Sequence, residues 1–145
     1  MKRLFDVFCS SVGLFFLSPL LISIGAAIKI SDGGPVFFVQ ERMGRNFRPF
    51  KLYKFRTMVM DAQKKGLAIT AADDPRITRV GGFLRRSKLD ELPQLINVIN
   101  GDMSLVGPRP EVQKYVQLFE KEYREILTVR PGLTDYAALE FIDEE

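Results

Sequence analysis

The sequence predicts an α+β protein that is mainly helical, with an N-terminal membrane hairpin followed by a small cytoplasmic domain. The run from Val7 to Ile28 carries no charged residue. Two short segments after it are rich in aromatic and β-branched residues, and most of the remaining chain has apolar residues at helical spacing. We therefore expect residues 1–30 to lie in the membrane and residues 31–145 to form the cytoplasmic domain.

The apolar run is predicted to enter and leave the membrane on the same side. Ser18 and Pro19 divide it into two halves, each about half as long as the hydrocarbon thickness when helical. Proline interrupts the hydrogen-bond ladder of a helix, and Ser18 can cap the backbone groups that it frees. Positive charges flank both ends of the run, at Lys2, Arg3, Lys29, Arg42, Arg45 and Arg48. This pattern favours a re-entrant helix-break-helix, with a single spanning helix as the alternative.

Turn residues and period-two segments predict a basic β-hairpin directly after the membrane segment. Strands are expected over Val36–Gln40 and Phe50–Arg56, joined by a turn at Gly44–Asn46. The later elements are a helix over Met58–Gly66, a loop over Leu67–Pro75, a helix over Arg76–Arg86, a helix from Asp90 to Asn100, a turn at Val106–Pro110, an amphipathic helix from Pro110 to Leu127 and a turn at Arg130–Thr134.

Composition excludes several kinds of chemistry. The chain has no histidine, so Ser-His and Cys-His pairs and histidine-ligated zinc are ruled out. The net charge of +3 and the pI of about 9.1 suit nucleic acid, anionic lipid and phosphorylated small molecules equally well. Cys9 is the single cysteine and cannot form an internal disulfide, which fits a cytoplasmic setting. Chemistry must therefore rest on carboxylates, cationic side chains, hydroxyls or a hard metal.

Asp90 and Glu91 form the candidate catalytic pair. Pro93 is tolerated only in the first turn of a helix, so Asp90 is expected at or beside a helix N-terminus. One interpretation is a structural N-cap, alone or as a capping box with Ser87, worth about 1 kcal/mol. The other is a carboxylate that attacks phosphorus with help from a divalent metal, because a helix N-terminus favours anions.

Cationic side chains around this pair would assist phosphate chemistry. Arg85, Arg86 and Lys88 precede it, and Arg109 is held between Pro108 and Pro110. A rigidly placed guanidinium is suited to bidentate contact with a phosphate. The residues alone therefore indicate a membrane-associated protein that binds phosphate, with Glu91 more plausibly holding the metal or orienting the site.

Seven ordered blocks resemble the bacterial sugar transferase family, the small monotopic phosphoglycosyl transferases. They are Lys2-Arg3-Leu4-Phe5-Asp6, Ser18-Pro19, Gly34-Pro35-Val36-Phe37-Phe38, Tyr53-Lys54-Phe55-Arg56-Thr57-Met58, Leu89-Asp90-Glu91-Leu92-Pro93-Gln94-Leu95, Gly101-Asp102-Met103-Ser104-Leu105-Val106-Gly107-Pro108-Arg109-Pro110 and Arg130-Pro131-Gly132-Leu133-Thr134. The blocks cover most of the chain in order, which is far more specific than any one motif.

The resemblance implies an enzyme of the bacterial inner membrane whose catalytic domain faces the cytoplasm. It would transfer a sugar phosphate from a UDP-sugar to undecaprenyl phosphate and release UMP, initiating glycan assembly. The implied route is ping-pong, through a phosphosugar on Asp90, with Mg²⁺ held by Asp90 and Glu91. Lys54, Arg56, Arg86 and Arg109 would face phosphates. Membrane phospholipids are expected partners and nucleic acid is not, while a homo-oligomer is left open.

The family pattern is not complete. Members often continue after Pro-Gly-Leu-Thr with Gly-Trp and a further stretch, whereas Asp135-Tyr136 follows here and the chain stops at Glu145. This leaves open a short variant or a fragment. Two alternative functions also remain: a membrane phosphohydrolase that uses water as acceptor, and a basic module without activity that binds membrane surfaces or nucleic acid.

Overall fold

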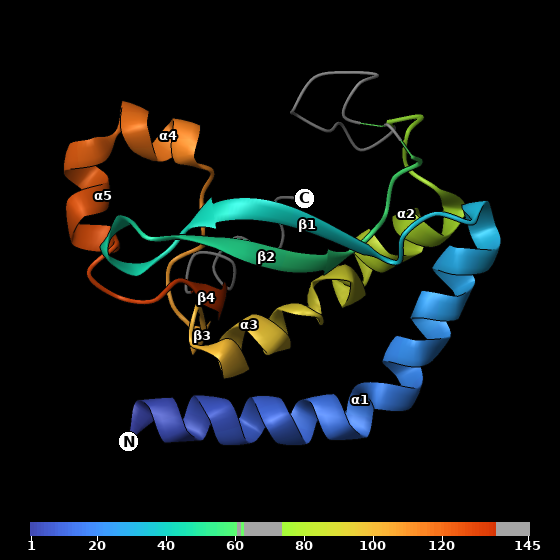
Figure 1. Cartoon of the computed structure of the whole chain (residues 1–145), viewed down its shortest axis with the longest axis horizontal. Coiled ribbons are helices and arrows are strands. Elements are labelled where there is room, and N and C mark those ends of the chain that lie inside the picture. The colour runs from blue at the N-terminus through green and yellow to red at the C-terminus, as the bar shows by residue number, and fades with distance from the viewer. Residues whose placement is uncertain (61, 63–73, 136–145) are drawn as a thin grey trace. The chain divides into compact units, whose positions relative to one another are not determined.

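The computed structural model of the chain combines helices with two small sheets (Figure 1). It describes residues 1–60, 62 and 74–135. The described elements are α1 (Lys2–Asp32), β1 (Phe37–Met43), η1 (Arg45–Phe47), β2 (Pro49–Phe55), α2 (Arg79–Arg86), η3 (Leu89–Glu91), α3 (Gln94–Asn100), β3 (Ser104–Val106), α4 (Gln113–Leu118), α5 (Glu120–Ile126) and β4 (Gly132–Thr134). The mixed character of the fold and the hairpin of β1 and β2 are confirmed.

Helix α1 is long and apolar enough to cross a membrane, judged by length and composition. Only 11% of its most apolar window is buried, whereas the core helix of a soluble protein would be mostly buried. The sequence predicted two helices with a break at Ser18–Pro19. The chain is helical on both sides of Pro19, within α1, and the break itself stays a prediction. A proline removes only its own N–H from the ladder, and the Ser23 hydroxyl donates to the Pro19 carbonyl at 2.8 Å. The re-entrant path stays a prediction.

The chain divides into two compact units, each containing part of α1. Unit 1 comprises Met1–Phe16, Val39–Tyr53 and the chain from Gln94 onward, and unit 2 comprises Leu17–Phe38 and Lys54–Pro93. Both strands of the hairpin pass from one unit into the other. The predicted division into a membrane segment over residues 1–30 and a cytoplasmic domain over residues 31–145 concerns a bilayer and stays a prediction.

Unit 1 attaches the first turns of α1 to its small parallel sheet. Asp6 is only 4% exposed and accepts a hydrogen bond from the Ser104 hydroxyl at 2.8 Å, while Lys2 donates to the Val106 carbonyl at 2.9 Å. The opposite side of these turns is exposed and apolar, with Leu4, Phe5, Phe8, Phe15 and Phe16 at the surface. This part of α1 is therefore amphipathic, with its polar side bonded to protein.

Strands β3 and β4 pair in parallel, with Ser104 opposite Gly132 and Val106 opposite Thr134. A side chain on Gly132 would overlap the backbone of Gly107, so this close approach requires glycine. The predicted turn at Arg130–Thr134 contains β4, and the predicted turn at Val106–Pro110 begins where β3 ends. The pairing was missed because strands of three residues have no measurable period.

The predicted helix from Pro110 to Leu127 is two helices, α4 and α5. Phe119 separates them with φ −124° and ψ 42°. Val116 and Leu127, on either side of this joint, both pack with Met43 in one buried cluster. A continuous helix would carry the chain away from that cluster, so tertiary packing overrides the local pattern. A continuous amphipathic helix would bury Tyr115 and Phe119 on its apolar face, but both side chains are exposed.

Unit 2 packs the second half of α1 against β2, α2 and η3. Its core consists of Ile24, Ile28, Phe55 and Leu84, with Leu89 packed against it. Met58 pairs with Ile77 in an isolated antiparallel bridge, so the predicted helix does not begin at Met58. Residues 61 and 63–66 of that predicted helix, and residues 67–73 of the predicted Leu67–Pro75 loop, lie outside the described residues. The core of unit 2 therefore joins the apolar segment to the candidate catalytic pair.

Candidate functional site

The acidic pair lies on a single 3-10 turn rather than at the start of a long helix. Lys88 precedes this turn in the left-handed conformation, with φ 56°. Asp90 is buried, with 9% of its surface exposed, and Leu89 anchors the turn in the core of unit 2. Packing of Leu89 therefore fixes the backbone of the turn that carries the two carboxylates.

The structure contradicts the capping box with Ser87. The Ser87 hydroxyl donates to the carbonyls of Phe83 and Leu84, at 2.9 and 3.2 Å, at the end of α2. No side-chain hydrogen bond caps the turn at its first residue, Lys88. The predicted helix joined the turn and α3 into one element, whereas they are separate in the structure. Ser87 lies at the end of the preceding helix, α2.

Lys54 and Glu91 form an ion pair within unit 2. The Nζ atom of Lys54 lies 2.7 Å from Oε1 of Glu91, and about a fifth of each side chain is exposed. A charge-assisted hydrogen bond of this kind is among the stronger side-chain contacts. The pair holds the cation of β2 beside the acidic turn, and the predicted contact of Lys54 with phosphate stays a prediction.

Arg85 lies closer to the acidic pair than the sequence alone indicated. The sequence predicted only that it adds positive charge, and assigned the phosphate contact to Arg86. The Arg85 Nε donates to the Thr57 hydroxyl at 2.9 Å, and the charge of Arg85 acts on Asp90. Arg86 points elsewhere on α2 and is exposed. A signal was present, because Arg85 is four residues after Gly81 and therefore on the same helix face. Gly81 is where α2 meets the Thr57 backbone so closely that any side chain would overlap it.

The environment of Asp90 raises the pKa of its carboxyl group above the ordinary value. Burial is the main cause, because it disfavours the charged form. The charge of Lys54 opposes this rise, the charge of Glu91 adds to it, and Arg85 opposes it more weakly. Asp90 is therefore a desolvated acid poised between two cations and one like charge, which is typical of functional sites.

Arg56 follows β2 in unit 2 and is also buried, with 8% of its surface exposed. Its guanidinium fills the space over Gly34, where a Cβ atom would lie 2.8 Å from the guanidinium carbon. The Arg56 amide donates to the Val36 carbonyl at 2.9 Å. These contacts hold Arg56 in the turn that leads from α1 into β1. Arg109 is exposed and belongs to unit 1, and its phosphate contact stays a prediction.

The acidic pair fits a magnesium ion only with help from a substrate. Among the described residues there is no group of three or more Asp, Glu or Cys side chains that could hold a metal by itself. Mg²⁺ in proteins is often bound by one or two carboxylates, water and substrate phosphates. Asp90 and Glu91 supply two adjacent carboxylates, of which Glu91 is also paired with Lys54.

Comparison with known proteins gives a consistent result. The family model described as "Bacterial sugar transferase" matches residues 1–145. The chain is 44% identical to the "Putative undecaprenyl-phosphate N-acetylgalactosaminyl 1-phosphate transferase" of Bacillus subtilis, over 83% of this chain and 68% of that protein. It is 43% identical to the "UDP-glucose:undecaprenyl-phosphate glucose-1-phosphate transferase" of Escherichia coli, over 96% of this chain and 31% of that protein.

A third relative is the "UDP-N-acetylgalactosamine-undecaprenyl-phosphate N-acetylgalactosaminephosphotransferase" of Aeromonas hydrophila, 41% identical over 94% of this chain. The chain spans 33% of that protein. It therefore corresponds to about a third of two of these relatives and to about two thirds of the third. Because the family model matches the whole sequence, the chain belongs to the bacterial sugar transferase family.

Proposed function

We propose that the chain transfers a sugar phosphate from a UDP-sugar to undecaprenyl phosphate through a covalent intermediate on Asp90. The observation that carries the proposal is the buried Asp90 beside Glu91, Lys54 and Arg85, on a turn packed against the second half of α1. The names of the three relatives support the reaction class, since each includes undecaprenyl phosphate. They differ in the sugar, so the sugar is left unassigned.

In the first step a carboxylate oxygen of Asp90 attacks the phosphorus that carries the sugar. The new O–P bond forms as the bond to the bridging oxygen breaks, and UMP leaves with that oxygen. Arg85 and Lys54 lie where they stabilise negative charge on the diphosphate. In the second step an oxygen of undecaprenyl phosphate attacks the same phosphorus, which frees Asp90 and leaves a polyprenyl diphosphate sugar.

Asp90 and Glu91 are the residues that would hold Mg²⁺, whose positive charge would reduce repulsion between the carboxylate and the diphosphate. Glu91 also keeps Lys54 in place through their ion pair. We assign Glu91 this double role and do not give it a proton-transfer step. Arg56 is proposed to hold phosphate from the turn after β2, and Arg86 and Arg109 to extend the cationic surface for the substrate.

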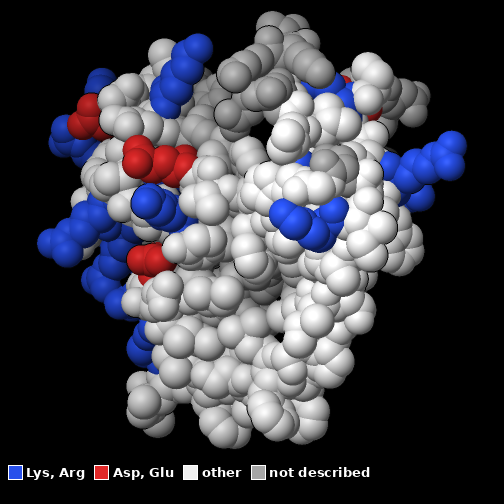
Figure 2. Space-filling view, turned by 45° about the vertical axis from the view of Figure 1, so that its right-hand side comes forward, with Lys and Arg blue, Asp and Glu red and all other residues white. Residues whose placement is uncertain are grey.

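The proposed location is the cytoplasmic face of the inner membrane. The apolar length of α1 and its low burial support a membrane helix. Figure 2 shows side chains other than Lys, Arg, Asp and Glu gathered in the lower part of the view. In α1 the exposed apolar residues include Phe5, Phe8 and Ile22, as expected for a helix that meets lipid. The core of unit 2 then brings the acidic turn close to the membrane, where a polyprenyl acceptor is found.

A covalent-labelling assay tests the function. Protein, Mg²⁺ and a UDP-sugar labelled in the sugar should release UMP and label the protein before any acceptor is added. Undecaprenyl phosphate should then discharge the label into lipid. Asp90→Asn should abolish the adduct, whereas Glu120→Gln, an exposed carboxylate on α5, should leave it unchanged. A labelled Asp90→Asn protein would refute the nucleophile, and discharge to water alone would indicate a phosphohydrolase.

A further inference from the structure

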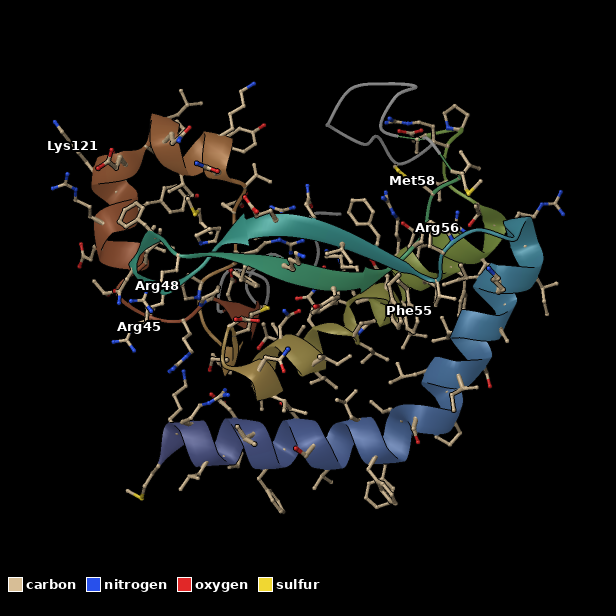
Figure 3. All side chains as sticks on the ribbon, in the orientation of Figure 1. Arg45, Arg48, Phe55, Arg56, Met58 and Lys121 are labelled. Carbon is tan, nitrogen blue, oxygen red and sulfur yellow. The ribbon has the colours of Figure 1, made fainter. Side chains whose placement is uncertain are left out.

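A cationic cavity lies at the closed end of the β1–β2 hairpin, within unit 1. It has a volume of about 290 Å³ and is formed by the turn between the two strands, by Gly101 and Asp102, and by Arg130. Figure 3 shows Arg45 and Arg48 together at this end of the hairpin. Neither the candidate catalytic pair nor any of the cations assigned to it lines this cavity, so the reaction proposed above leaves it without a role.

The lining has an excess of positive charge. Three arginines, Arg45, Arg48 and Arg130, face one acidic residue, Asp102. Asp102 already accepts a hydrogen bond from the Asn97 amide at 3.3 Å, and Arg130 donates to the Gly101 carbonyl at 2.8 Å. Within the described part of the chain, Arg45 and Arg48 have no side-chain hydrogen bond or ion pair. Their guanidinium groups are therefore available to an anion.

The turn that carries these two arginines is held in an unfavourable conformation. Asn46 and Phe47 both have left-handed backbones, with φ 58° and 57°, which is rare for a residue as bulky as phenylalanine. The Asn46 amide donates to the Leu127 carbonyl at 2.7 Å, and Phe47 packs against the cluster around Met43. Such strain persists only where the surroundings fix it, so Arg45 and Arg48 project from a rigid base.

The cavity lies beside the first turn of α1. The Arg3 guanidinium donates to the carbonyl of Ile99 at 2.9 Å, and a Cβ atom on Gly101, which lines the cavity, would lie 3.4 Å from Arg3 Nη2. Immediately after Arg3, the exposed apolar residues Leu4, Phe5 and Phe8 begin. Lysine and arginine at such a junction are expected at the level of the lipid headgroups. With α1 in the membrane as proposed above, the cavity would lie near the level of the lipid phosphate groups.

We propose that this cavity binds the phosphate ester of an anionic phospholipid headgroup, such as phosphatidylglycerol. The net positive lining favours a headgroup with net negative charge over a zwitterionic one, and the open, exposed position of Arg45 and Arg48 suits a ligand that arrives in the membrane plane. The proposal rests on the membrane association given under Proposed function but not on the chemistry at Asp90. Free phosphate shares the same chemistry and is distinguished by the experiment.

Vesicle binding by the full-length chain tests the lipid site. The affinity for vesicles of phosphatidylcholine mixed with phosphatidylglycerol is compared with that for phosphatidylcholine alone. In the double variant Arg45→Gln/Arg48→Gln the preference for the mixed vesicles should fall by about tenfold or more, on the basis of the usual contribution of each cation near a membrane surface. The control is Lys114→Gln/Lys121→Gln, which removes the same charge from exposed positions on α4 and α5.

An equal loss in both double variants would overturn the proposal, because it would indicate diffuse attraction rather than a site. Inorganic phosphate is titrated in parallel against the detergent-solubilised protein. Saturable binding of phosphate that depends on Arg45 and Arg48, with an unchanged vesicle preference, would also overturn it by assigning the cavity to a soluble anion. The covalent assay is independent of these measurements, so a failure of the transferase proposal is seen separately.

Discussion

Burial of Asp90 disfavours the ionised form of its carboxyl group. The attack on phosphorus that we propose needs an ionised carboxylate, yet the surroundings of Asp90 raise its pKa. In the absence of metal the native state therefore holds its proton to higher pH than the unfolded state does. Since the native state then binds more protons, stability falls as pH rises from the ordinary value of 3.8 through the raised native value.

Asp90→Asn should accordingly stabilise the protein at neutral pH when the metal is chelated. The amide is neutral at every pH, so the variant avoids the cost of a buried charge. Its melting temperature should exceed that of the wild type at pH 7, and the difference should shrink as the pH is lowered toward 3.8. Thermal unfolding with EDTA across this range measures the effect. A difference that stays constant with pH would show that the charge of Asp90 is not its cause.

Lys54 should set the pH at which the enzyme becomes active. Its charge lowers the pKa of Asp90, so Lys54→Met should raise that pKa further and move the acid limb of UMP release to higher pH. Lys54→Arg keeps the charge beside Glu91 and should restore much of the original profile. If Lys54→Met lowers the rate equally at all pH values, Lys54 acts only in binding or packing.

At the scale of single elements, α2 is positioned by one glycine. Gly81 allows the helix to meet the Thr57 backbone, and this contact places Arg85 against the Thr57 hydroxyl. At the neighbouring Gly82 there is room for a side chain, since a Cβ atom there would make an ordinary van der Waals contact, 3.9 Å from Ile77 Cγ2. The two adjacent glycines thus have different roles in the same helix.

Gly81→Ala should destabilise the protein by about 1–3 kcal/mol, because the added carbon forces the helix away from Thr57. Gly82→Ala should be neutral or stabilising by up to about 1 kcal/mol, since alanine is the better helix former. Denaturant unfolding of both variants provides the comparison. Equal effects would mean that the close contact of Gly81 does not determine the position of α2.

The path of α1 through the bilayer is a prediction at the same scale. In a Cys9→Ser background, single cysteines at Lys2→Cys and Ser31→Cys should react with an impermeant thiol reagent from the same side of the membrane. A re-entrant helix returns both ends to the cytoplasm, as the flanking positive charges indicate. Labelling from opposite sides would show a single spanning helix instead.

Elements with a strong local pattern could be predicted from the sequence. β1, β2, α2 and α3 follow from turn residues and periodicity, and Asp90, Glu91 and Lys54 follow from the family blocks. The division of α4 from α5 could not be predicted, because it depends on Val116 and Leu127 meeting Met43, which is far away in sequence. The same holds for β3 and β4, whose pairing depends on backbone contact between Gly107 and Gly132.

Within the site, the choice between Arg85 and Arg86 shows where sequence reasoning stopped. Both lie in the last turn of α2 and both are cationic, so composition does not separate them. The helix face that carries Gly81 separates them, but that face becomes meaningful only when the Thr57 backbone is seen beside it. Arg109 lies in a specific family block, but it belongs to unit 1, whereas Asp90 belongs to unit 2.

For the whole molecule, the interleaving of the two units has a consequence for synthesis on the ribosome. All residues of unit 2 lie between Leu17 and Pro93 in the sequence. Unit 1, in contrast, contains both the first turns of α1 and β4 at Gly132–Thr134. Chains emerge from the N-terminus, so unit 2 can close while the C-terminal third is still being made. The polar side of the first turns of α1 must then wait for Ser104 and Val106 of β3, to which Asp6 and Lys2 bond. The apolar side of these turns stays exposed throughout. Delivery of the nascent chain to the membrane before translation ends would protect that surface during the wait.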